Sequence, residues 1–193
     1  MSSVSRLVYP EKKLTKRQPV CRMVMRLWNN DPQDRKSEMG MTQQEAVILM
    51  AEENSGKNKE ADILELVRER SLANPFPKYN HINLSVLERD HVEMYVDPGP
   101  DSMNYAGAVH GGLFFTMADF CAATTARTDG RKYVTLSAEV HYMKNVREGR
   151  ITAKSTLVHR GRTSVLVDVN VYSESGDLLF TARVTMFCVG EYT

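Results

Sequence analysis

The sequence lacks the features that mark several large classes of protein. Its three cysteines are far apart and follow no CxxC or Cys/His ligand spacing, which argues against a disulfide framework or a metal site. No apolar run approaches the roughly 20 residues that a membrane-spanning helix needs, and the N-terminus has no apolar core of a secretory signal. The formal net charge is only +1, which argues against nucleic-acid binding by the chain as a whole. We therefore expect a cytoplasmic protein without a membrane span or a bound metal.

The length and the charge distribution predict one domain with an N-terminal extension. A chain of 193 residues can bury a sizeable core, and the Pro75-Phe76-Pro77 segment marks a break in its pattern. Residues 1–36 are rich in lysine and arginine, whereas residues 37–75 are acidic. We expect an extension over residues 1–76 and the main domain over residues 77–193.

The extension contains two predicted helices. Thr42-Gln-Gln-Glu45 is a capping box that predicts a short helix to about Glu53. Asn54-Ser55-Gly56 predicts a break, and residues 59–70 predict a second helix. A basic arm before small helices suits DNA or an acidic partner, or else a solvated extension that packs on the domain or its dimer mate. No recognition-helix pattern is visible, so nucleic acid is not the expected partner.

After residue 77 the pattern changes to strands around one long helix. Alternating apolar residues predict strands, β-branched and aromatic residues dominate them, and connections of a few residues imply antiparallel neighbours. An apolar helix is predicted over about residues 109–127. The predicted strands are residues 81–87, 92–96, 133–146, 151–159, 164–173 and 178–189. The expected architecture is α+β, with a curled antiparallel sheet that wraps the helix.

The strand over residues 133–146 has an apolar and a polar set of side chains. The alternation assigns one face to Val134, Leu136, Ala138, Val140 and Tyr142. It assigns the opposite face to Thr135, Ser137, Glu139 and His141. A polar strand face is normally solvated, and it can also line a wet cleft.

One carboxylate stands in the most apolar stretch of the chain. Asp119 is the only charged residue of the segment GGLFFTMADFCAATTA, residues 111–126. Burial of an unpaired acid costs several kcal/mol. The sequence therefore predicts that Asp119 is paired or faces a cavity where it performs chemistry.

A polar, glycine-marked segment precedes this helix. The first backbone N–H groups of a helix can polarise a carbonyl group, and Gly111 and Gly112 let a ligand approach them. The same glycines also suit a tight turn, His110 an orienting role, and Asn104 a turn or cap. Asp119 follows His110 by about two and a half turns, too far for both to hold one atom. The motif therefore predicts a site at a dimer interface.

These residues form a spaced motif with a known counterpart. Asn104-x-x-Gly107-x-x-His110-Gly111-Gly112-x6-Asp119 resembles the motif of hotdog-fold acyl-CoA thioesterases of the phenylacetate-pathway type, in the 4-hydroxybenzoyl-CoA thioesterase-like superfamily. The resemblance covers about residues 80–189. It implies a hotdog fold in homodimers that share a continuous sheet, often paired into homotetramers.

The resemblance also implies an activity and a role for each residue. The substrate is an acyl-CoA, cleaved to a free acid and coenzyme A without any further cofactor. Asp119 activates water or attacks the thioester, and Ser137 helps to hold that water. Asn104 and the Gly111 N–H flank the thioester carbonyl from the opposite subunit, and His110 shapes the loop.

Coenzyme A carries phosphates, so we expect basic residues at the mouth of the site. Arg160 and Arg162, which flank a predicted turn at Gly161, are the first candidates. Charges that are simply solvated in a turn explain them equally well.

Two other functions remain open at this point. Gly161-Arg162-Thr163 and residues 180–187 also resemble acyl-CoA-sensing hotdog repressors, which bind acyl-CoA without cleaving it and carry an N-terminal DNA-binding extension. A hotdog hydratase or dehydratase would instead use His110 and Asp119 for proton transfer. The combined presence of Asp119, Asn104 and Ser137 favours hydrolysis.

Overall fold

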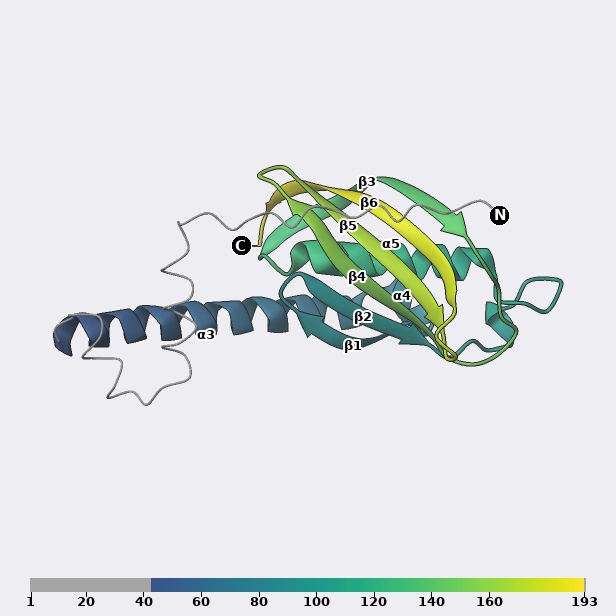
Figure 1. Cartoon of the computed structure of the whole chain (residues 1–193), viewed down its shortest axis with the longest axis horizontal. Helices are drawn as coiled ribbons and strands as arrows, with labels where there is room; N and C mark the ends of the chain where they lie inside the picture. The colour runs from purple at the N-terminus through teal and green to yellow at the C-terminus, as the bar shows by residue number, and fades with distance from the viewer. Residues whose placement is uncertain (1–42, 193) are drawn as a thin grey trace, which may run out of the picture. The chain divides into compact units, whose positions relative to one another are not determined.

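The computed structural model of the chain describes residues 43–192 (Figure 1). The basic arm over residues 1–36 and Thr42 of the predicted capping box lie outside the described residues. Contacts divide the chain into two units between Ser55 and Gly56, and the second unit contains every strand and the long apolar helix. The domain boundary predicted at residue 76 stays a prediction.

The N-terminal helix is longer than predicted. Helix α3 runs without a break from Gln43 to Ala73, 31 residues, so the predicted interruption at residues 54–56 is wrong. A glycine inside a helix costs only about 1 kcal/mol relative to alanine, and Asn54 and Ser55 cost less. Glutamate and alanine on both sides of these residues, and lysine after them, favour the helix enough for it to continue.

A short helix follows α3 at the predicted proline break. Helix α4 spans Pro75–Tyr79, and Asn74 caps its start by accepting a hydrogen bond from Phe76 N at 3.3 Å. Proline is favourable in the first turn of a helix because its missing N–H would have no partner there. The prolines therefore start a new helix as well as ending the preceding one.

Six strands form one antiparallel sheet, as predicted. They are β1 (Asn83–Glu88), β2 (His91–Val96), β3 (Arg131–Tyr142), β4 (Ile151–Arg160), β5 (Ser164–Ser173) and β6 (Leu178–Glu191). Their order across the sheet is β1-β2-β4-β5-β6-β3, and all neighbours are antiparallel. Strands β1 and β3 are therefore the two edges.

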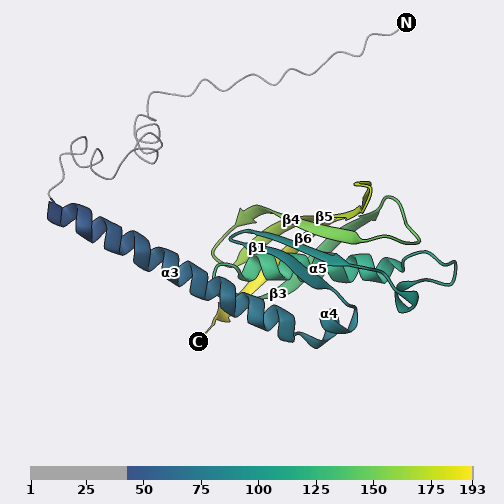
Figure 2. The same cartoon turned by 90° about the horizontal axis from the view of Figure 1, so that it is seen from below.

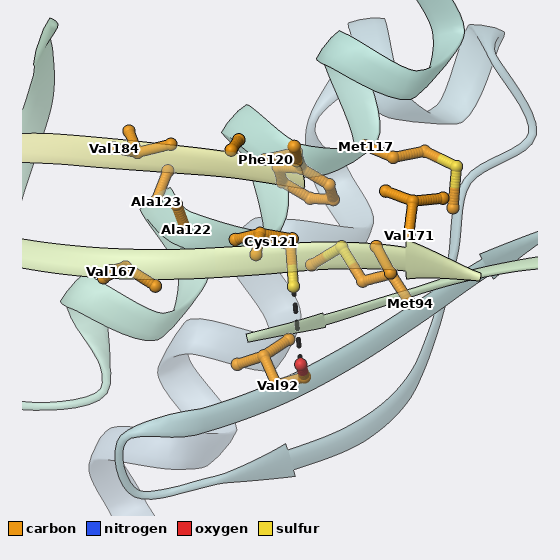
Figure 3. Packing of buried hydrophobic residues seen from close by; sticks show 14 of the residues in the cluster. Val92, Met94, Met117, Phe120, Cys121, Ala122, Ala123, Val167, Val171 and Val184 are labelled. Carbon is orange, nitrogen blue, oxygen red and sulfur yellow. Dashed lines mark hydrogen bonds between the residues drawn. The ribbon is translucent and has the colours of Figure 1, made fainter. Parts of the chain in front are cut away.

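Helix α5 (Gly111–Arg127) lies along the inner side of this curved sheet (Figures 1 and 2). Its apolar side chains pack against inward-facing residues of the strands, and Phe114, Met117 and Phe180 are almost completely buried. The Cys121 thiol donates a hydrogen bond to Val92 O at 3.4 Å within this core (Figure 3). Burial raises the pKa of Cys121 to about 12, so this thiol stays protonated and unreactive.

The last part of α3 contributes to the same core. Val67 is only 1% exposed. Ile63 packs close to Gly130, and a Cβ built on that glycine would lie 3.2 Å from Ile63 Cδ1. Gly130 has φ +85, a backbone conformation that other residues rarely adopt. The end of the N-terminal helix is thus part of the folded unit that starts at Gly56.

A bulge in β3 changes which side chains of this strand face the helix. The pairing of β3 with β6 shifts between Thr135, which lies opposite Met186, and Ser137, which lies opposite Thr185. Residues directly opposite share a face of the sheet. Met186 is fully buried under the sheet, so Thr135 faces inward with it, whereas Ser137 faces outward with Thr185.

The predicted faces of β3 are therefore wrong on one side of the bulge. Ala138 and Val140 pack against the core, and Tyr142 stacks edge-on against Phe180, as the alternation predicts. Val134 and Leu136 are instead 50% and 65% exposed. An extra residue in a strand moves every side chain before it to the other face, and sequence alternation alone does not reveal where it lies.

Candidate active site

The start of helix α5 is held by His110. His110 is the N-cap residue, and its Nδ1 accepts a hydrogen bond from Gly112 N at 3.0 Å while its carbonyl accepts one from Leu113 N at 2.9 Å. Nδ1 must be unprotonated to accept, so the proton of the neutral ring is on Nε2. Within residues 43–192 no acceptor bonds the Gly111 N–H. This amide points from the positive end of the helix and is available to a ligand.

Two neighbouring side chains explain why glycine stands at both positions after His110. A Cβ on Gly112 would lie 2.9 Å from His110 Nδ1, and a Cβ on Gly111 would lie 3.0 Å from the ring of Tyr142. The Tyr142 hydroxyl also donates a hydrogen bond to Gly111 O at 3.3 Å. The glycines thus allow the histidine cap and the close approach of Tyr142.

Asn104 organises the loop before the helix. Its Oδ1 accepts hydrogen bonds from Ala106 N at 2.9 Å and from Ala108 N at 3.2 Å. These two bonds determine which end of the carboxamide is oxygen, because only the oxygen can accept. The NH₂ group is left as the donor that Asn104 can offer to a carbonyl oxygen.

Asp119 lies on a partly exposed strip of helix α5. Gly112, Phe115, Thr116 and Asp119 follow helical spacing along this strip, and Phe115 is 41% exposed. Thr135 donates a hydrogen bond to Asp119 Oδ1 at 2.7 Å. The acid is therefore both paired and accessible.

Thr135 is the site residue that the sequence analysis did not identify. The family resemblance gave Ser137 on this strand the role of holding the hydrolytic water, but the bulge turns that side chain to the outer face. No hydrogen bond within the described residues joins Ser137 to Asp119. The only signal in the sequence was that Thr135 and Ser137 alternate on one strand.

The structure does not bring Arg160 to the His110 loop. Arg160 is at the other end of α5, where its side chain is 14% exposed and Nη1 donates to Asp129 Oδ2 at 2.6 Å and to Ala126 O at 2.8 Å. Its Nη2 donates to Thr125 O at 3.2 Å. These contacts cap the C-terminus of the helix, about 24 Å from its start at 1.5 Å per residue. Arg162 is exposed near this same end, where its backbone carbonyl accepts from Arg131.

Asp119 and Gly111 are also apart within one chain. Eight residues of α-helix separate them, which corresponds to about 12 Å. Asn104 and Gly111 lie together at the start of the helix, and Asp119 and Thr135 lie together further along it. The chain therefore carries two half-sites.

The described residues also bear on metal binding and on membrane insertion. Among residues 43–192, no three His, Cys, Asp or Glu side chains gather in a way that could hold a metal ion. None of the helices in this range has the length and apolarity to cross a membrane.

Comparisons with known proteins show what the chain is similar to. A family model described as "Thioesterase superfamily" matches residues 106–180, which include Gly111, Asp119 and Thr135. A Haemophilus influenzae protein named "Putative esterase" is 24% identical over 108 residues, which are 54% of this chain and 78% of that protein.

Solved structures of a Streptococcus pneumoniae TIGR4 protein, called a hypothetical thioesterase, are also similar. One contains coenzyme A and is 29% identical, with a TM-score of 0.56 over 58% of this chain and 91% of that chain. Two others carry alanine in place of an aspartate and of a threonine, and the threonine variant is 30% identical, with a TM-score of 0.54 over 57% of this chain and 91% of that one.

The PaaI protein of the Escherichia coli phenylacetic acid degradation operon has the same fold. It is 16% identical, with a TM-score of 0.63 over 69% of this chain and 96% of that chain.

Proposed function

The chain belongs to the thioesterase superfamily and has its hotdog fold, and on this basis we propose that it is an acyl-CoA thioesterase that releases a free acid and coenzyme A. One observation carries the assignment of the site. An accessible carboxylate, Asp119, is oriented by Thr135, and the same helix starts with an amide, Gly111 N–H, that has no acceptor among residues 43–192.

Asp119 performs the chemical step. As a general base it takes a proton from water, and the water oxygen attacks the thioester carbon while the carbonyl oxygen becomes negative. The C–S bond then breaks, and coenzyme A leaves as a thiolate that takes up a proton. As a nucleophile, the carboxylate attacks first and water then cleaves the resulting anhydride. Both routes use a carboxylate oxygen of Asp119, and in both the thioester carbonyl oxygen becomes negative.

Gly111 and Asn104 stabilise the negative oxygen. The Gly111 N–H, with the helix dipole behind it, donates to the developing oxyanion, and the Asn104 NH₂ group adds a second donor. One donor of this kind contributes about 10²–10³ in kcat. His110 holds the first turn of the helix, and Gly112 leaves room for that histidine.

The complete site requires two chains. The 12 Å between Asp119 and Gly111 is too long for one thioester, so Asp119 of one subunit must work with Asn104 and Gly111 of another. Edge strand β3 is open to such pairing, because β6 is its only neighbour in the described sheet. Exposed Phe115 and Leu136 beside it supply apolar contact area. We place the dimer interface along this edge, and a dimer of dimers is compatible with it.

The spacing of the acid and the threonine supports the role of this pair. The aspartate and the threonine replaced by alanine in the Streptococcus pneumoniae thioesterase are sixteen residues apart in its sequence. Asp119 and Thr135 have the same separation. The coenzyme A in another structure of that protein supports an acyl-CoA as the substrate class.

The assignment is tested with Asp119→Asn, which preserves the shape of the side chain. We expect thiol release from acyl-CoA substrates to fall at least about a hundredfold, the usual scale of general-base catalysis, with the folded state retained. Substrates should include acetyl-, hexanoyl-, palmitoyl- and phenylacetyl-CoA. Asp101→Asn is the matched control, because Asp101 is exposed in a short turn before the motif. Full activity in Asp119→Asn would falsify the role of this acid.

The regulator hypothesis gives a different outcome in the same assays. It predicts no thiol release by the wild-type protein, together with duplex DNA binding that weakens steeply with salt and is reversed by acyl-CoA. A gel-shift titration against the upstream region of its own gene detects such binding. The basic residues that would bind DNA are outside the described part of the chain.

A further inference from the structure

The loop that carries the oxyanion donors is tied to a single distant segment of the chain. Four residues outside it form long-range hydrogen bonds with residues 104–111 in the described structure. Tyr142, Asn145 and Arg147 donate hydrogen bonds from their side chains, and the backbone carbonyl of Val146 accepts one. All four belong to the end of β3 and its connection to β4. We call residues 142–147 the brace.

Arg147 holds the turn that Asn104 organises. Its Nη1 donates hydrogen bonds to Ala106 O at 2.9 Å and to Gly107 O at 3.3 Å. The amide of the same Ala106 donates to Asn104 Oδ1 at 2.9 Å, so one residue links the guanidinium to the carboxamide. Gly107 has φ +70, and a Cβ there would lie 3.2 Å from Arg147 Nη1. The turn is therefore shaped to receive this guanidinium.

Asn145 and Val146 hold the other end of the loop. Asn145 Nδ2 donates to Val109 O at 2.9 Å, and Val109 N donates to Val146 O at 2.9 Å. Asn145 Oδ1 in turn accepts from Val146 N at 2.8 Å, which orients its carboxamide. Val109 is fully buried and directly precedes His110. Both backbone groups of this residue are thus fastened to the brace.

The two ends of the loop carry the two donors that must meet at one oxygen. Donors to an oxyanion act when they are preorganised, and an error of about 1 Å in placement can cost a hundredfold in rate. Asn104 has its own Oδ1 occupied by the loop, so its NH₂ group can move only as the loop moves. The relative position of Asn104 and Gly111 therefore depends on the brace.

We propose that Arg147 and Asn145 are positioning residues for thioester hydrolysis, which set the Asn104 amide and the Gly111 N–H for one carbonyl oxygen. This inference rests on the proposed thioesterase function. Arg147 is exposed and acts through Ala106 and Gly107. Asn145 acts through Val109.

Arg147→Ala is the first test. We expect kcat for acyl-CoA hydrolysis to fall at least about tenfold, with KM changed by less than about threefold, because the lost contacts orient groups that act in the transition state. Arg147→Lys should recover part of kcat, since its ammonium reaches one carbonyl but lacks the planar fork. Arg183→Ala is the matched control. Arg183 is an exposed β6 residue that donates two hydrogen bonds to Asp168 and none to the loop, so the kcat of Arg183→Ala should be that of wild type.

A double-mutant cycle shows whether Arg147 acts through Asn104. In the Asn104→Ala background, Arg147→Ala should cost less than about threefold, because the donor it positions is already gone. Independent, multiplicative losses would overturn the positioning role, and so would an Arg147→Ala enzyme with wild-type kcat.

Asn145→Asp, which removes the donor to Val109 O, gives a second test. We again expect kcat to fall while KM changes little. If the wild-type protein releases no thiol from any acyl-CoA, both the thioesterase proposal and this inference are wrong. If the wild type is active and Arg147→Ala has the same kcat, only this inference is wrong.

Discussion

Thr135 holds the carboxylate on which the proposed reaction depends. Its hydroxyl donates to Asp119 Oδ1 at 2.7 Å and lies 3.7 Å from Met186 Sδ. A hydrogen bond to a charged acceptor contributes about 1.5–3 kcal/mol. Thr135→Val preserves volume and β-branching but removes the donor, so kcat should fall about tenfold or more. Thr135→Ser keeps the hydroxyl and should retain most of the activity. Steady-state thiol release measures both.

Ser137 provides the contrast to this prediction. The family resemblance assigns the water-holding role to Ser137, whereas the bulge directs Thr135 toward the acid. If the arrangement of β3 persists in the active enzyme, Ser137→Ala should change kcat by less than about threefold. The opposite ranking, with a large loss in Ser137→Ala and none in Thr135→Val, would show that β3 changes register when substrate or a second chain binds.

At the scale of the element, helix α5 is fastened at its two ends by different chemistry. A neutral histidine caps its start and leaves one amide open, whereas charged side chains close its end. Asp129, directly after the helix, accepts hydrogen bonds from Tyr133 OH at 2.7 Å and Arg131 Nε at 2.8 Å, and it also pairs with Arg160. The open end is the one to which we assign a role in catalysis.

The cluster around Asp129 should make the folded state less stable at acid pH. Burial alone would raise the pKa of Asp129, but hydrogen bonds from Tyr133 and Arg131 and the charge of Arg160 hold it below its ordinary value. A carboxyl with a lowered pKa stabilises the fold above the pKa of the unfolded chain, and that contribution disappears as the pH falls through the folded pKa. The contribution is therefore complete at pH 7 and begins to decline as the pH falls below the ordinary carboxyl pKa of about 4.

Asp129→Asn tests this prediction. The variant should lower the free energy of unfolding at pH 7 by about 2 kcal/mol. It removes the charged acceptor shared by Arg131, Tyr133 and the nearly buried Arg160, which keeps only Asp90 as a charged partner. The difference from wild type should be smaller at pH 3 than at pH 7, because below the ordinary carboxyl pKa of about 4 the unfolded wild-type chain takes up a proton at this residue. Urea unfolding at both pH values measures it. Asp97→Asn is the matched control, since Asp97 pairs with Arg150 through two hydrogen bonds on an exposed surface, where an ion pair contributes little.

At the scale of the whole molecule, the proposed site belongs to two chains. Asp119→Asn subunits lack the acid, and Asn104→Ala subunits lack the NH₂ group that donates to the thioester carbonyl. Each variant alone should therefore be nearly inactive. A mixed dimer contains one site in which both residues are wild type. After subunit exchange in an equimolar mixture, activity should return to about one quarter of wild type, because half of the dimers are mixed and each has one intact site.

The mixing experiment needs proof that subunits exchange. Differently tagged variants that are recovered together after mixing provide it. If exchange is demonstrated and activity stays at the level of the separate variants, the acid and the oxyanion donors do not come from different chains. In that case the half-sites described above would have to meet by another rearrangement.

The sequence alone was sufficient for the six strands and the apolar helix, and it singled out the acid on which the proposed function rests. Strand alternation and short polar turns located all six strands, since burial on one face of a sheet imposes a period of two on the side chains. The single charge in an apolar helix identified Asp119, because unpaired burial of a carboxylate is too costly to occur without a reason. These inferences depend only on neighbours along the chain.

Tertiary structure decided the rest, because the deciding contacts join residues far apart in the sequence. The bulge that selects Thr135 over Ser137 exists only in the register of β3 against β6. Arg160 caps α5 through groups more than 30 residues away, which no local pattern records. Helix α3 continues through Gly56 because the cost of a glycine is small compared with the helix around it. Local spacing specifies which residues can do the chemistry, and long-range packing specifies which of them face one another.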